Sequence, residues 1–286
     1  MKQEPHKHVI FYIFAGREKF MSILLKYVNV LLNRGIISEV HIWDYTRTKQ
    51  DKKYVYGVCN SNDGYTLKIP TKNEKNWDES YHYYRDTLRE SDKVIKCDDD
   101  IVYIDIESFG DWVNCIEDGK FYYPNIVNND VCAYLQQKIG VHNLFDYDVD
   151  YDTFKNKKTS TPLTGWGKFA WFRSSKKANK IHKLFLKNKD KFILKKIPYE
   201  TYNSRISINM FGCTGQTFKT FLPHETLGRN DEAIVSARCG AGNILNLNTT
   251  IVHFAFAPQK KLENDNELLY RYVELSIKQT KGMNER

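Results

Sequence analysis

Residues Lys93-Val94-Ile95-Lys96-Cys97-Asp98-Asp99-Asp100 place three consecutive aspartates directly after a short β-rich run. Such a run, bounded by polar residues, is typical of a β-strand. Ligands of open α/β folds bind outside the carboxyl ends of the strands, which is where these aspartates fall. In an extended chain Asp98 and Asp100 point to one side and Asp99 to the other. The stretch therefore predicts two converging carboxylates at the edge of a sheet.

A bound cation would relieve the mutual repulsion of these carboxylates, and a hard divalent ion prefers oxygen ligands of this kind. A helix cap or a turn on a surface loop would also account for a triple aspartate. The preceding strand favours the metal site over this alternative, because it fixes the aspartates at the ligand-binding edge of a sheet.

The residues before this stretch predict a β-α-β start. Residues 8–14 form a nearly continuous apolar run, as expected for a strand buried on both faces of a mostly parallel sheet. The loop Ala15-Gly16-Arg17 breaks the run. Apolar residues then recur at helical spacing up to Gly35, a glycine stop, and residues 39–43 read as a second strand. Two strands joined by one helix predict a parallel crossover.

The remaining segments predict further alternation of helices and strands. In the first half we expect strands at 54–59, 65–69, 101–104 and 121–123, and helices at 78–90 and 106–117. In the second half we expect an exposed loop at 146–164, strands at 169–172 and 250–256, and helices at 176–196, 203–211, 231–238 and 263–278. The fold class is therefore α/β, with a mostly parallel central sheet flanked by helices.

Composition narrows the class of protein. The chain has 286 residues, 41% of them hydrophobic, which is enough to bury a core. It contains no apolar run of about 18 residues, so we expect no transmembrane segment and a cytoplasmic location. Six scattered cysteines without a C-x-x-C pair argue against a zinc knuckle and a disulfide framework.

The net charge of +8 admits a nucleic acid, a membrane surface or an anionic substrate as partner. The densest basic stretch, residues 176–196, interleaves lysines with apolar residues at helical spacing. An amphipathic helix with solvated lysines explains that pattern. A surface for an anionic membrane or a polymeric acceptor is the alternative, and peripheral attachment to a membrane is the corresponding alternative location.

The glycine-containing loop after the first strand, the acidic Asp44 after the second and the D-x-D of Asp98 to Asp100 together resemble the GT-A glycosyltransferases. The resemblance covers most of the chain. It implies a Rossmann-like, single GT-A domain over residues 1–286 with an acceptor-side lobe. Residues 1–125 would bind a nucleotide sugar, and residues 126–286 would bind the acceptor.

The resemblance also implies a cofactor, Mn²⁺ or Mg²⁺. Asp100 would be a direct metal ligand, and Asp98 would contact the ribose or the metal. His253, within the apolar run 251–256, would be a third ligand, since many GT-A enzymes supply a histidine from a late strand and imidazole suits Mn²⁺ better than Mg²⁺. A hydrogen-bonded core histidine is the alternative.

For the donor, the resemblance implies a nucleoside-diphosphate sugar, with a UDP-sugar favoured and a GDP-sugar as the alternative. Small loop residues let a ribose approach the backbone, an aspartate can accept from a base N–H, and arginine can pair with phosphate. Arg85 is followed by Asp86, whereas many GT-A enzymes have an asparagine at that position. The donor-binding candidates are Phe14, Ala15, Gly16, Arg17, Asp44, Arg85, Asp98 and Asp99.

Catalysis is assigned by the same resemblance to the acidic pair Asp231 and Glu232. Glu232, with Asp231 as the fallback, would take the proton of an acceptor hydroxyl, as expected of an inverting enzyme. Gly165, Trp166 and Gly167 would line the sugar and the acceptor, because an aromatic face can stack on a sugar ring.

The predicted function is therefore metal-dependent transfer of a sugar to a hydroxyl of a glycan or glycoconjugate acceptor. A sugar nucleotidyltransferase is the enzymatic alternative, but its glycine-rich signature loop is missing. A nuclease would need a second acidic cluster, so no nucleic acid is expected, and no Walker A pattern is present. A carbohydrate-binding module, which needs no general base, is the non-enzyme alternative.

Overall fold

The computed structural model describes residues 8–71, 78–144, 174–194, 199–201, 206–222, 231–238 and 241–283. Its strands are β1 (Val9–Ala15), β2 (Glu39–Asp44), β3 (Tyr65–Lys68), β4 (Lys93–Asp98), β5 (Ile101–Ile104), β6 (Lys120–Val127), β7 (Tyr199–Thr201), β8 (Met210–Thr214) and β9 (Gly242–His253). The principal helices are α1 (Glu18–Asn33), α2 (Lys49–Asn60), α3 (Asp78–Thr87), α4 (Phe109–Asn114), α5 (Asp130–Lys138), α7 (Ser175–Lys187), α9 (Gly215–Phe221) and α12 (Asn266–Thr280). Shorter helices are α8 (Lys189–Phe192), α10 (Asp231–Ala233) and α11 (Lys260–Glu263).

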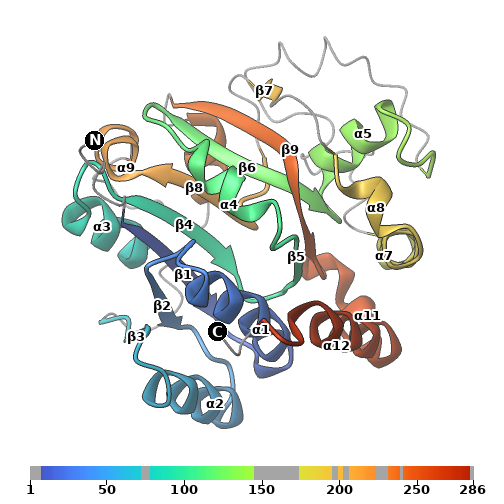
Figure 1. Ribbon diagram of the computed structural model, residues 1–286, viewed down its shortest axis with the longest axis horizontal. Helices are drawn as coiled ribbons and strands as arrows, with labels where there is room; N and C mark the ends of the chain where they lie inside the picture. The colour runs from blue at the N-terminus through green and yellow to red at the C-terminus, as the bar shows by residue number, and fades with distance from the viewer. Residues whose placement is uncertain are drawn as a thin grey trace.

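All the described strands form one sheet in the order β3-β2-β1-β4-β8-β6-β9-β5, and β7 pairs with β9 (Figure 1). β1 to β4 are parallel to one another, and β6 and β9 run in the same direction as they do. Only β5, β7 and β8 are reversed. The predicted α/β fold with a mostly parallel sheet is confirmed. The assignment of residues 1–125 and 126–286 to donor and acceptor stays a prediction, although strands of both halves share this sheet.

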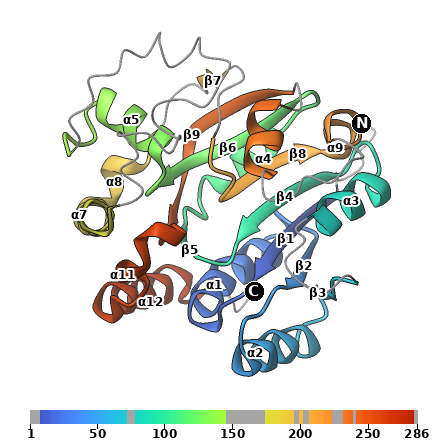
Figure 2. The ribbon, with the colours of Figure 1, turned by 180° about the vertical axis from the view of Figure 1, so that it is seen from behind.

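Helices cover both faces of the sheet because both faces of its central strands are apolar (Figures 1 and 2). On one face Phe11 of β1 packs against Phe109 of α4, with ring centroids 6.3 Å apart. On the other face Tyr12 stacks on Tyr84 of α3 at 4.3 Å. The alternation of side chains along β1 therefore divides the core into two layers.

The predicted β-α-β start is confirmed. α1 buries the apolar side chains that recur every three or four residues, among them Phe20, Leu24 and Leu31. The helix is followed by Gly35, whose φ of +67° is the left-handed conformation that glycine adopts without steric cost. The chain then enters β2, which pairs in parallel with β1.

The strand predicted at 54–59 is wrong, because these residues lie in α2. The hydroxyl of Thr48 caps the helix by accepting from the Asp51 N–H at 3.1 Å. Val55 is the buried residue of this helix. The helix packs against β2 and β3 and adds no strand to the sheet. The cap and the local packing outweigh the β-propensity of the segment.

The helix predicted at 203–211 is also wrong over its described part, since residues 206–209 are not helical and Met210 begins β8. β8 lies between β4 and β6, and a side chain at its Gly212 would come within 3.1 Å of Trp112. Pairing with β4 and β6, which are distant in the sequence, thus makes this segment a strand instead of a helix. The loop predicted at 146–164 and the strand at 169–172 lie outside the described residues.

Other boundaries differ in length. The late strand begins at Gly242 instead of residue 250, and the helix at 231–238 has one α-helical turn followed by a π-helix. The basic helix is divided at Asn188 into α7 and α8. No helix in the described part of the chain is long and apolar enough to cross a membrane.

His182 joins α7 to the core behind the carboxyl end of β9. Its Nε2 lies 2.8 Å from the carbonyl of Phe254, and its Nδ1 lies 2.7 Å from the hydroxyl of Tyr272 on α12. The neutral ring satisfies both contacts, by donating to the carbonyl and accepting from the hydroxyl. Burial lowers the pKa of His182 to about 4.

We predict that the free energy of unfolding falls as the pH drops from about 6.5 to 4. In this window the unfolded histidine binds a proton that the native ring does not bind, so the native state loses up to about 3 kcal/mol. Urea titrations of the intact protein and of His182→Gln at several pH values measure the effect. The intact protein should show the steeper dependence, and equal slopes would contradict the assignment.

Candidate functional site

The site is assembled where β4 ends and β5 begins. Asp98 closes β4, and the turn of Asp99 and Asp100 leads into β5. β5 pairs antiparallel with β9, which places Ile101 opposite His253. The next N–H, that of Phe254, donates to the carbonyl of Asp100 at 2.9 Å. Strand pairing therefore brings a late histidine to the triple aspartate.

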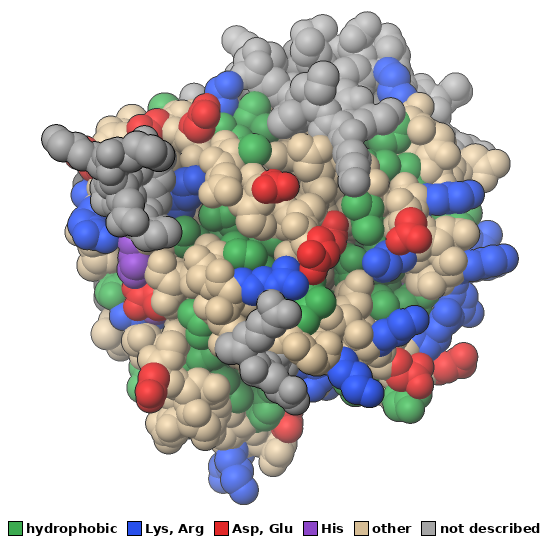
Figure 3. Space-filling model, in the orientation of Figure 1, with side chains coloured by type: hydrophobic (Ala, Val, Ile, Leu, Met, Phe, Trp, Pro, Cys, Tyr) green, Lys and Arg blue, Asp and Glu red, His purple; other side chains and the backbone are tan. Residues whose placement is uncertain are grey.

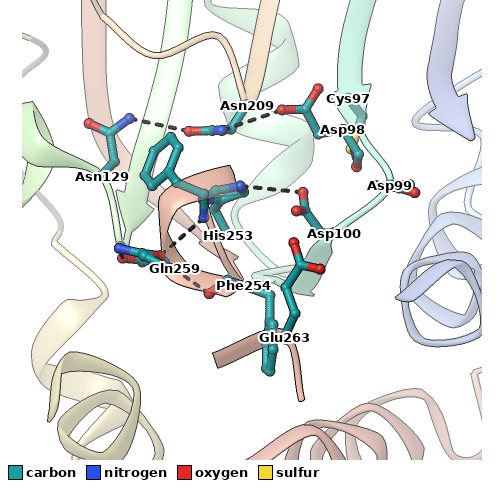
Figure 4. Close-up of polar contacts among 12 residues, drawn as sticks. Cys97, Asp98, Asp99, Asp100, Asn129, Asn209, His253, Phe254, Gln259 and Glu263 are labelled. Atoms are coloured by element: carbon teal, nitrogen blue, oxygen red, sulfur yellow. Dashed lines mark hydrogen bonds and ion pairs between the residues drawn. The ribbon is translucent and has the colours of Figure 1, made fainter. Parts of the chain in front are cut away.

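The side chains of Asp98, Asp100 and His253 converge (Figure 4). One ligand atom from each lies within 4.8 Å of the others. Nε2 of His253 is 3.3 Å from Oδ1 of Asp100, and its buried Nδ1 has no hydrogen-bond partner among the described residues. Ligand atoms about 2.1 Å from an ion lie up to about 4.2 Å apart, so small side-chain rotations would close the shell. Two carboxylates and one imidazole fit Mn²⁺.

Asp98 is held from both sides. Lys96, on the same face of β4, donates to its Oδ1. Asn209 donates to its Oδ2 at 3.3 Å (Figure 4). Asn129, the N-cap of α5, donates in turn to the side-chain oxygen of Asn209 at 3.4 Å. The ammonium of Lys96 also donates to the carbonyl of Ile208 at 2.7 Å. The Asp98 carboxylate therefore has a fixed orientation before any ligand binds.

Asp99 points to the other side of the turn, as the strand alternation predicts (Figure 4). Its Oδ2 accepts from the backbone N–H of Gly16 at 2.9 Å and from Nε of Arg17 at 3.2 Å. Its Oδ1 accepts from Nη2 of Arg17 at 2.5 Å. A side chain at Gly16 would meet Oδ2 of Asp99 at 3.1 Å and the carbonyl of Tyr45 at 3.3 Å. Asp99 thus fastens the loop between β1 and α1 to the end of β4.

Arg17 connects Asp99 and Asp100 to Glu263, a residue from the other end of the chain. Its Nη2 donates to Oδ2 of Asp100 at 2.7 Å, and its Nη1 donates to Glu263 of α11 at 3.1 Å. The arginine is 13% exposed and Asp100 is 5% exposed. Because solvent screens these ion pairs only weakly, loss of either partner would leave a costly unpaired charge.

The side chains around the triple aspartate carry more negative than positive charge, which favours binding of a divalent cation. Leaving His253 aside, the cluster contains four carboxylates and two cationic side chains, a net charge of −2: Asp98, Asp99, Asp100, Glu263, Arg17 and Lys96. An excess of negative charge in a partly buried cluster is unfavourable, and a bound cation would neutralise it. The charge balance supports the same conclusion as the ligand geometry.

The pKa values of the two buried aspartates differ in direction. Burial raises the pKa of Asp99 to about 6, although Arg17 opposes the change. Burial also acts to raise the pKa of Asp100, but the neighbouring His253 and Arg17 outweigh it and hold this pKa below its usual range. Asp100 is therefore ionised at any pH at which a metal ligand is needed.

The nucleotide candidates lie around the end of β1. Phe14 packs edge-on against Tyr45 and Tyr81, and the ammonium of Lys96 lies 4.9 Å from its ring centroid. Ala15 is fully buried and accepts from the Tyr45 N–H through its carbonyl. These contacts order the loop that begins at Gly16.

Asp44 and Arg85 make local contacts. Oδ1 of Asp44 accepts from the hydroxyl of Thr46 at 2.6 Å, and Nε of Arg85 donates to Asp86 at 2.8 Å. Asp44 ends β2 beside Ala15, at the same edge as the triple aspartate. Their roles in nucleotide binding stay predictions.

The acidic pair lies on the α3 side of the site. Oδ2 of Asp231 accepts from the hydroxyl of Tyr81 at 3.3 Å, and Oε1 of Glu232 accepts from Ser207 at 3.3 Å. Burial raises the pKa of Asp231, and the positive charge of Lys96 opposes this. Asp231 is thus electrostatically linked to the lysine that holds Asp98. Gly165, Trp166 and Gly167 lie outside the described residues.

Sequence reasoning missed three side chains of the site. Lys96 could have been noticed, because a lysine two residues before Asp98 shares its face of an apolar strand. Asn209 and Glu263 carry no local signal, since only the pairing of β8 with β4 and the position of α11 bring them to the aspartates.

Comparison with known proteins gives a fold but no close relative. No protein-family model matches this sequence, and no curated protein matches it. Among solved structures, GalNAc-T7, crystallised with UDP, GalNAc and Mn²⁺, aligns over 95% of this chain and 50% of its own, with a TM-score of 0.52 and 9% identity. This chain has the GT-A fold.

The chain spans about half the length of that GT-A structure. Another solved structure, 4-diphosphocytidyl-2C-methyl-D-erythritol synthase from Anaerococcus prevotii, matches 42% of this chain and 56% of its own, with 14% identity. Its TM-score is 0.32, and the fold assignment does not rest on it.

We predict that Arg17→Met lowers the free energy of unfolding by about 3 kcal/mol, because it leaves buried carboxylates without their cation. The matched control is Arg34→Met, since Arg34 pairs with Glu107, which is 68% exposed. An exposed pair contributes at most about 1 kcal/mol. Urea unfolding without metal measures both variants. Equal losses would show that the Arg17 network does not stabilise the fold.

Proposed function

We propose that the protein is a metal-dependent glycosyltransferase that moves a sugar from a nucleoside-diphosphate sugar to a hydroxyl of a glycan or glycoconjugate. The observation that carries the proposal is the convergence of Asp98, Asp100 and His253 at the carboxyl edge of a GT-A sheet. That edge is where α/β folds bind nucleotides. The likeness to GalNAc-T7, solved with UDP and Mn²⁺, supports the same class of substrate and cofactor.

Asp98, Asp100 and His253 would hold the cation, Mn²⁺ in preference to Mg²⁺ because one ligand is an imidazole. When bound, the ion would neutralise the donor diphosphate and stabilise it as a leaving group. Lys96 and Asn209 orient Asp98 for this role. Arg17, which donates to Oδ2 of Asp100, favours the ionised form of this carboxylate.

The donor nucleotide would lie over the loop from Phe14 to Arg17 and reach toward Asp44. A UDP-sugar is the favoured donor, since UDP is the nucleotide of the solved neighbour, and a GDP-sugar is the alternative. Asp99 supports this loop through Gly16 and Arg17. We therefore assign Asp99 a positioning role instead of the direct donor contact expected from the sequence.

For the base we favour Asp231 over Glu232. Asp231 is linked to Tyr81 by a hydrogen bond and to Lys96 and Asp98 by charge, whereas Oε1 of Glu232 accepts from Ser207. A pKa raised by burial makes a carboxylate a better proton acceptor near neutral pH. Asp231 would take the acceptor hydroxyl proton as that oxygen attacks the anomeric carbon, which gives an inverted product.

The proposed function predicts that nucleotide binding depends on the metal. The intact protein should bind UDP more tightly with Mn²⁺ than with chelator, and Asp100→Asn should abolish the Mn²⁺-dependent part. Isothermal calorimetry measures both affinities without requiring turnover. Asp63→Asn, an exposed aspartate in the turn before β3, is the control and should bind like the intact protein.

If UDP, GDP and their sugars all fail to bind with either metal, the glycosyltransferase proposal is wrong. If they bind equally well with chelator, the metal site assigned to Asp98, Asp100 and His253 is wrong.

A second prediction separates the two candidate bases. Once a donor is known, Asp231→Asn should lower kcat by about 10²-fold or more and leave donor affinity unchanged, since a general base acts on the transfer step. Glu232→Gln should retain activity within about tenfold. UDP release with a panel of glycan acceptors measures both. The reverse ranking would return the role to Glu232.

A further inference from the structure

α7 carries a straight row of lysines on its exposed face. Positions four, seven and eleven residues after the first lysine fall on the same side of an α-helix, within about 60° of one another. Eleven rises along the helix separate the first lysine from the last, so the row is about 16 Å long. The opposite side of α7 is buried in the core through Ala178, Ile181 and Phe185. The lysine row consists of Lys176, Lys180, Lys183 and Lys187, all exposed.

This arrangement is unfavourable for the isolated helix. Like charges four residues apart repel each other, and the first turn of α7 contains lysine but no acidic residue, which opposes the helix dipole. No described carboxylate forms an ion pair with the lysine row. Residues 174–192 contain seven lysines and one aspartate, a net +6 of the chain's +8. The segment therefore concentrates charge beyond what solubility needs.

The basic region extends over more than one helix. α11 packs against α7 and exposes Lys260 and Lys261. Figure 3 shows Lys and Arg side chains gathered on the side where Figure 1 places α7 and α12. A charge pattern spread over two helices is complementary to a surface, whereas a single groove would suit a linear polyanion.

The basic region also adjoins the candidate site. α11 ends at Glu263, whose carboxylate accepts from Arg17, and Arg17 donates to Asp100. A partner bound along α7 and α11 would thus lie beside the candidate metal cluster.

We propose that the lysine row docks the protein on an anionic lipid surface, so that an acceptor presented at that surface reaches the site. Each lysine near an anionic bilayer strengthens binding by on the order of fivefold. Removing four of them should weaken binding by on the order of a hundredfold or more, and salt should weaken it as well.

The test is co-sedimentation with vesicles of phosphatidylcholine alone and of phosphatidylcholine with phosphatidylglycerol, at low and high salt. The row variant combines Lys176→Gln, Lys180→Gln, Lys183→Gln and Lys187→Gln. The control removes the same charge from exposed positions away from α7, α11 and α12: Lys49→Gln, Lys52→Gln, Lys53→Gln and Lys219→Gln. Urea unfolding confirms that both variants are folded.

The intact protein and the control variant should bind only the anionic vesicles, and the row variant should lose this binding. Equal losses in both variants, or no binding of the intact protein at low salt, would overturn the proposal. Binding to a soluble acidic polysaccharide but not to vesicles would also overturn it, in favour of a polyanionic acceptor. Because no nucleotide is present, this result is independent of the glycosyltransferase proposal.

Discussion

The pairing of β5 with β9 is the constraint on which the candidate site depends. Asp100 directly precedes β5, so the register that sets Ile101 opposite His253 also sets the imidazole against the carboxylate. A shift of one residue would turn the histidine to the other face of the sheet. The bond from the Phe254 N–H to the Asp100 carbonyl extends this pairing past the last residue of the strand. The candidate metal ligands are therefore positioned by the same hydrogen bonds that join β5 to β9 in the sheet.

The three consecutive aspartates have different structural roles because each carboxylate has different partners. Asp98 is oriented by Lys96, Asp99 is fastened to the β1–α1 loop by Arg17, and Asp100 is shared between Arg17 and His253. This division couples the β1–α1 loop, the candidate nucleotide-binding loop, to the candidate metal cluster through one arginine. It also explains how adjacent carboxylates can be buried, since their charges are distributed over several partners.

The parts of the fold and site that follow from local periodicity could be predicted from the sequence. The alternation at the end of β4 predicted that Asp98 and Asp100 would share a side, and the apolar run at 251–256 placed His253 on a strand. α2 and β8 were missed because a helix cap and an inserted central strand override local propensity. Asn209 and Glu263 depend on tertiary contacts that no sequence spacing encodes.

The central claim is that Asp98, Asp100 and His253 form a divalent-metal site facing a nucleotide diphosphate. Anomalous diffraction from crystals grown with Mn²⁺ and UDP tests it directly. The account predicts one manganese peak bonded to the two carboxylates and the imidazole, with diphosphate oxygens completing its shell beside Arg17. A manganese ion bound elsewhere, with these three side chains still joined to one another and to Arg17, would contradict it.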